Sequence, residues 1–102
     1  MNLDEEGAEI RKETRGRLAD EMQDNEVFRD AIQKLRDRAL HDFKTAEPND
    51  AEALMTARLR FAVVEQFIRD IVYVSKTGKL ARTALQHWRE KVQQAKERQR
   101  SQ

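Results

Sequence analysis

The fold is decided by the stretch AEALMTARLRFAVVEQFIRDIVYVSK, residues Ala51 to Lys76. This stretch contains neither Gly nor Pro, and its apolar residues recur at intervals of three and four, which predicts one long helix. At ~1.5 Å per residue, such a helix spans about 35–40 Å. It is the longest uninterrupted helical pattern in the chain, and we expect the other elements to be arranged around it.

This predicted helix carries two apolar stripes. The first follows the spacing of a coiled-coil seam and consists of Leu54, Ala57, Phe61, Val64, Ile68 and Ile71. The second lies on roughly the other side and consists of Met55, Leu59, Val63, Phe67 and Val74. One antiparallel neighbour can cover only one stripe, so the other must meet the C-terminal helix or another subunit. We predict that one of the two stripes forms an oligomer interface. The candidate residues are Leu54, Phe61, Val64, Ile68 and Ile71 of the first stripe, or Val63 and Phe67 of the second.

A second helix is predicted before this one, from Val27 to Thr45, because apolar residues again recur at steps of three and four. Pro48 ends it, and Asn49 and Asp50 are good N-cap residues for the helix that follows. Because the connection is short, the two helices are expected to form an antiparallel hairpin.

The N-terminal residues 1–16 contain few apolar side chains, and Gly7 and Gly16 interrupt them. A helix there would have little to hold it down, so we predict a mobile acidic arm; the functional variant of this interpretation is an arm that becomes ordered when a partner binds. A short helix is expected from Arg17 to the region of Asp24 and Asn25, and these last two residues can cap the next helix.

After the long helix, Thr77 and Gly78 predict a helix end, since Gly favours the left-handed conformation that closes a C-terminus. Helical spacing resumes from Lys79 to about Lys96, and residues 97–102 are expected to fray as a basic tail. The predicted fold class is all-α: an antiparallel hairpin plus a C-terminal helix, with a short extra N-terminal helix. Residues 17–96 are predicted to form one helical domain.

Charge is distributed unevenly along the chain. Residues 1–50 hold nine Lys and Arg against fourteen Asp and Glu, whereas residues 76–102 hold eight against two. The C-terminal cations predicted to bind nucleic acid or an acidic protein surface are Arg82, Arg89, Lys91, Lys96, Arg98 and Arg100. Trp88 lies in an apolar stripe with Leu85 and Val92, which favours packing over stacking on bases.

The sequence provides no motif for an enzyme, and no catalytic residue, metal ligand, cofactor or small-molecule substrate is predicted. Glu5, Glu9 and Glu13 share a helical face, but no His stands three residues from any of them, as a di-iron site requires. His41 and His87 are the only histidines, and we interpret His41 as a surface residue in the helix. The absence of Cys excludes a disulfide scaffold and fits a reducing compartment, and no apolar run is long enough for a membrane span. We expect a cytoplasmic protein.

Two segments, LADEMQDNEVFRDAIQKLRDRAL from Leu18 to Leu40 and SKTGKLAR from Ser75 to Arg82, are similar to small all-helical proteins of bacteriophage packaging and virion modules. The shared features are a short helix ending at Met22, the stripe with Phe28 and Leu35, and a turn at Gly78 to Ala81. The resemblance implies a non-enzymatic viral assembly component, located in the host cytoplasm or the virion. Its role would resemble that of a small terminase subunit, whose helical hairpins form rings and present DNA to a packaging motor. This chain departs from many such proteins because no helix-turn-helix precedes its hairpin.

Two hypotheses remain open from the sequence. The first is a homo-oligomeric helical assembly protein whose basic C-terminal helix contacts nucleic acid or an acidic partner. The second is a monomeric or dimeric inhibitor or adaptor that binds another protein through its charged ends.

Overall fold

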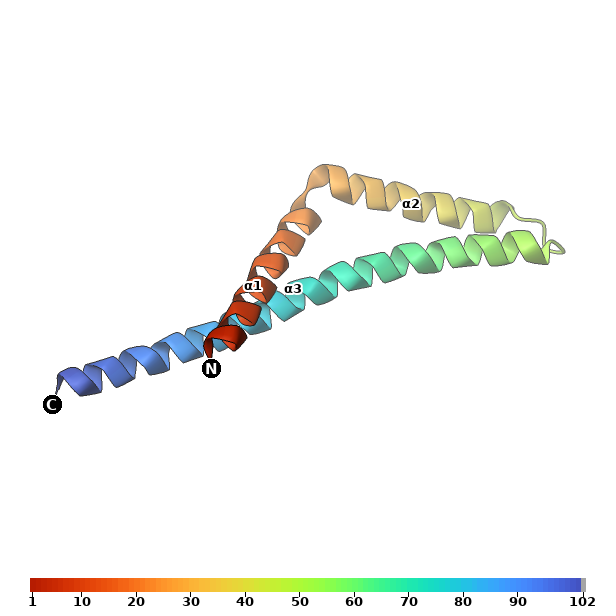
Figure 1. Cartoon of the computed structure of the whole chain (residues 1–102). Helices are drawn as coiled ribbons and strands as arrows, with labels where there is room; N and C mark the ends of the chain where they lie inside the picture. Colours follow the sequence, from red (N-terminus) through yellow and green to blue (C-terminus); the bar gives the residue numbers. More distant parts are fainter. Residues whose placement is uncertain (102) are drawn as a thin grey trace. The chain divides into compact units, whose positions relative to one another are not determined.

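The computed structural model describes residues 1–101, which contain three helices and no strand (Figure 1). The helices are α1 (Leu3–Asp24), α2 (Glu26–Thr45) and α3 (Ala51–Arg100). The predicted all-α fold class is therefore confirmed. Contacts divide the chain into two compact units, one formed by Glu21–Val72 and the other by Met1–Asp20 together with the chain from Tyr73 onward.

In the first unit, α2 lies antiparallel to the beginning of α3, as the short connection predicted (Figure 1). The predicted cap of α2 is confirmed, because the side chain of Asn25 accepts a hydrogen bond of 2.9 Å from the backbone N–H of Phe28. At the N-terminus of α3, Asp50 Oδ1 accepts a hydrogen bond of 3.0 Å from the backbone N–H of Ala53 and so caps this helix. Polar side chains thus cap the N-termini of both hairpin helices, and Pro48 lies in the connection between them.

The structure corrects the predicted start of the N-terminal helix: residues 3–16, predicted as an acidic arm, are the first part of α1. The reason is a capping box at the very start of the chain. Asn2 Oδ1 accepts a hydrogen bond of 2.8 Å from the backbone N–H of Glu5, and the Glu5 carboxylate accepts one of 3.4 Å from the backbone N–H of Asn2. Asp4, Glu5 and Glu6 also place negative charge in the first turn, where the helix dipole favours it.

The predicted helix end at Thr77 and Gly78 is wrong, because α3 continues from Ala51 to Arg100 without a break. It also passes the predicted end at Lys96. Gly78 does not have the positive φ of a helix-terminating glycine, so the proposed turn from Gly78 to Ala81 is part of the helix. Its role is instead to let α1 approach, since a Cβ on Gly78 would lie 2.5 Å from the Cα of Gly16.

The second unit is built around this crossing of α1 and α3 (Figure 1). The residues buried there are small except for one, and they are Gly16, Ala19, Ser75, Gly78, Ala81 and Leu85. The buried hydroxyl of Ser75 donates a hydrogen bond to the carboxylate of Asp20, so its polar atom is satisfied across the two helices. Close backbone approach, rather than large side chains, therefore defines this unit.

Candidate interaction surfaces

The first apolar stripe of α3 lies inside the α2–α3 hairpin. Leu54, Phe61, Val64, Ile68 and Ile71 are all half-buried, and Ala57 in the same stripe is 2% exposed. Ile68 and Ile71 line a groove together with Phe28 and Ile32 of α2. The five half-buried residues all belong to the predicted oligomer interface, and they thus contribute to the interior of one chain.

Four of the five residues of the second apolar stripe remain exposed, whereas the fifth, Val74, is half-buried. Met55, Leu59, Val63 and Phe67 have exposed fractions of 55%, 57%, 68% and 46%, and we call these four residues the exposed stripe. Among them, Phe67 makes a tilted ring contact with Phe28 at 6.3 Å, so it borders the hairpin interior. Val63 and Phe67 are the two members of the predicted interface that the hairpin leaves accessible. α2 accordingly covers one stripe of α3 and not the other.

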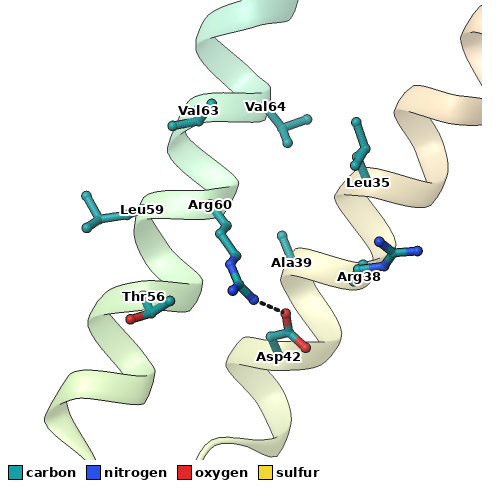
Figure 2. A pocket seen from close by; sticks show the side chains of 9 residues that line it. All are labelled: Leu35, Arg38, Ala39, Asp42, Thr56, Leu59, Arg60, Val63 and Val64. Atoms are coloured by element: carbon teal, nitrogen blue, oxygen red, sulfur yellow. Dashed lines mark hydrogen bonds and ion pairs between the residues drawn. The ribbon is translucent and has the colours of Figure 1, made fainter.

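An apolar groove runs along the hairpin beside the exposed stripe (Figure 2). Its volume is about 700 Å³, and its apolar lining consists of Leu35 and Ala39 from α2 with Leu59, Val63 and Val64 from α3. Figure 2 shows Val64 pointing toward α2, whereas Leu59 projects away from it. The groove and the exposed stripe therefore share residues and form one continuous apolar surface.

Charged residues border this groove. Arg60 Nη1 of α3 donates a hydrogen bond of 3.2 Å to Asp42 Oδ2 of α2, and this ion pair bridges the two helices (Figure 2). On the other side of the hairpin, Arg36 Nε lies 2.8 Å from Glu65 Oε1 and forms a second bridge. The sequence pattern did not predict the groove, although Leu35 and Ala39 belong to the apolar stripe predicted for α2.

The six predicted C-terminal binding residues are all exposed on α3. They do not share one face. At about 100° per residue, Arg82, Arg89, Lys96 and Arg100 lie on one side of the helix, and Lys91 and Arg98 lie on the opposite side. Trp88, predicted to pack, is half-buried, as is Val92.

No group of three or more His, Asp or Glu side chains within residues 1–101 is arranged to hold a metal ion. Both histidines are exposed, and Glu5, Glu9 and Glu13 lie on α1 without converging on a site. In the part of the chain that the structure describes, no helix combines the length and apolarity that a membrane span needs.

Comparison with known proteins identified no matching family model, no matching curated protein and no matching solved structure.

Proposed function

We propose that this protein is a non-enzymatic component of a homo-oligomeric helical assembly. The observation that carries the proposal is the exposed stripe Met55, Leu59, Val63 and Phe67, which lies on the scaffold helix and continues into an apolar groove. Exposed apolar surface of this kind is typical of protein–protein interaction sites. A second copy of the chain is the partner that we infer for it.

A further observation supports a second copy as the occupant. Residues 1–50 are acidic and residues 76–102 are basic, so each copy can provide both halves of a complementary charged contact. We place the protein in the cytoplasm, and on the resemblance described above we propose a bacteriophage packaging or virion assembly, in the host cytoplasm or the virion.

The mass of the protein in solution tests this proposal. In the variant L59E/V63E, two charges enter the exposed stripe, and their desolvation would oppose association. We expect light scattering to give the mass of several subunits for the wild type and that of a monomer for the variant. Helical circular dichroism should be unchanged, because both side chains are already exposed.

The matched control is V27E/L80E, which introduces the same charges at side chains 77% and 73% exposed that lie outside the exposed stripe. This control should keep the wild-type mass. A wild type that is monomeric at all concentrations would contradict the proposal and favour an adaptor or inhibitor that binds a different protein. An oligomer that survives L59E/V63E would contradict the assignment of the interface.

A further inference from the structure

The C-terminal part of α3 presents a polar stripe with a regular pattern. Its residues follow alternating steps of four and three, and they are Arg82, Gln86, Arg89, Gln93, Lys96 and Arg100, which we call the cationic stripe. All six are exposed. This spacing keeps side chains on one face of a helix, and from Arg82 to Arg100 the stripe spans about 27 Å at ~1.5 Å per residue.

The four positive charges of the cationic stripe have no counter-ion within the described residues. The ion pairs in residues 1–101 join Lys12 to Glu9, Arg36 to Glu65 and Arg60 to Asp42. The two carboxylates near the stripe, Glu90 and Glu97, instead accept hydrogen bonds of 3.4 Å from the side-chain amides of Gln86 and Gln93. The glutamines therefore engage the nearby acidic groups, and the cations face solvent.

The helix dipole accounts for only part of this pattern. Cations are favourable at a helix C-terminus, but the effect is confined to the last turn, which here holds Arg98 and Arg100. Arg82 and Arg89 lie several turns earlier. Their alignment with Lys96 and Arg100 needs another explanation, and an extended anionic partner provides one.

The composition of the cationic stripe distinguishes between two kinds of anionic partner. Interfaces between proteins have an apolar core from which charged residues are depleted, whereas interfaces with nucleic acid are polar and strongly positive. The stripe consists of Arg, Lys and Gln alone. Both Arg/Lys and Gln side chains commonly bind phosphate oxygens.

We propose that the cationic stripe binds the phosphate backbone of nucleic acid without reading its sequence. This surface is separate from the exposed stripe, so the proposal goes beyond self-association and does not depend on it. Lys91 and Arg98, on the opposite face of the same helix, are outside the contact.

A titration with a fluorescently labelled DNA duplex of mixed sequence, followed by anisotropy, tests the proposal. For four phosphate contacts, the logarithm of the association constant should fall with the logarithm of salt concentration with a slope of about −3.6, measured between about 50 and 200 mM. In R89E/K96E two contacts are lost, so we expect at least about a tenfold loss of affinity and roughly half the slope.

The control K91E/R98E exchanges the same two residue types in the same helix and changes the net charge equally. It should keep the wild-type affinity within about threefold, since long-range repulsion is screened over a Debye length of about 10 Å at 0.1 M salt. Circular dichroism should show equal helix content in both variants, because all four side chains are exposed.

Three outcomes would overturn the proposal. A wild type that does not bind the duplex at about 50 mM salt lacks the contact, since sequence-independent binding is strongest at low salt. Equal losses of DNA affinity in R89E/K96E and K91E/R98E would indicate that binding depends on net charge rather than on the cationic stripe. Binding of poly-glutamate in place of DNA, lost in R89E/K96E, would assign the cationic stripe to an acidic protein.

The variant L59E/V63E separates this proposal from the proposed self-association, because it should lose self-association and keep the salt-dependent contact of each chain with DNA.

Discussion

The α1–α3 crossing and the α2–α3 hairpin pack their helices in contrasting ways. At the crossing, small residues on both helices are buried, and Gly16 and Gly78 bring the two backbones into contact. In the hairpin, only Ala39 and Ala57 are buried, while the larger apolar side chains are half-buried or exposed. The small residues that meet at the crossing are therefore buried, whereas the larger apolar side chains along the hairpin are only partly covered.

This difference shows where a partner would contribute most. Stabilisation by the hydrophobic effect grows with the apolar area removed from water, at roughly 25 cal/mol per Å². The hairpin still exposes Leu59 and Val63 by more than half, so further burial there is favourable. At the crossing, Leu85 and Ala81 are already at 0% and 1% exposure, so these two side chains gain nothing from further burial.

Truncation of one leucine in each region should give the largest difference in the free energy of unfolding between the crossing and the hairpin. Leu85→Ala removes a side chain that is 0% exposed, and we expect a loss of about 3 kcal/mol in the free energy of unfolding. Leu59→Ala removes a side chain that is 57% exposed, and it should cost less than about 1 kcal/mol at a protein concentration where the chain is monomeric. Urea unfolding followed by circular dichroism measures both. Equal losses would show that the two regions are packed alike.

Adding one methyl group to a glycine should give a smaller effect that is specific to the crossing. Gly78→Ala improves helix propensity, but its Cβ would lie within 2.5 Å of Gly16, so the helices must separate. We expect a net loss of about 1–2 kcal/mol in the free energy of unfolding.

The control for this prediction is Gly7→Ala in the same helix as Gly16. A Cβ at position 7 meets only the Arg11 guanidinium, at an ordinary distance of 3.5 Å. This variant should therefore gain about 0.5–1 kcal/mol in the free energy of unfolding from helix propensity alone. If Gly78→Ala also stabilised the protein, the close contact of the two glycines would not exist in solution.

Hydrophobic periodicity and capping residues were sufficient to predict the hairpin. Val27 to Thr45 and Ala51 onward follow an apolar period close to 3.6, and Asn25 and Asp50 cap the two helices as their residue types suggested. The same pattern predicted two stripes on α3. Which stripe α2 would cover could not be predicted, because both have similar apolar content and the choice depends on how the helices meet in three dimensions.

Two of the errors in the predicted helix boundaries came from interpreting Gly and charge as local signals. Gly78 was interpreted as a helix end, but its lack of a side chain serves a contact with Gly16, which is distant in sequence. The acidic residues 3–16 have little apolar content, yet the pair Asn2 and Glu5 forms a capping box that the sequence already contained. A pairing between remote glycines has no signature in a single sequence, whereas the capping box was a signal that could have been used.

The smallest expected effect on stability concerns ion pairs. Within residues 1–101 they join the two helices of the hairpin but do not join α1 to α3 at the crossing. Arg36 holds Glu65 through two nitrogens, at 2.8 and 3.4 Å, and both side chains are about one-third exposed. Glu65→Gln should cost about 0.5–1 kcal/mol in the free energy of unfolding. Asp42→Asn should cost less than about 0.5 kcal/mol, because its partner Arg60 is 66% exposed. A double-mutant cycle with Arg36→Gln isolates the pairwise contribution, which should shrink as salt is added. A coupling of zero at low salt would show that the Arg36–Glu65 pair does not hold α2 to α3, and it would leave apolar packing and the more exposed Arg60–Asp42 pair as the attractions between the two helices.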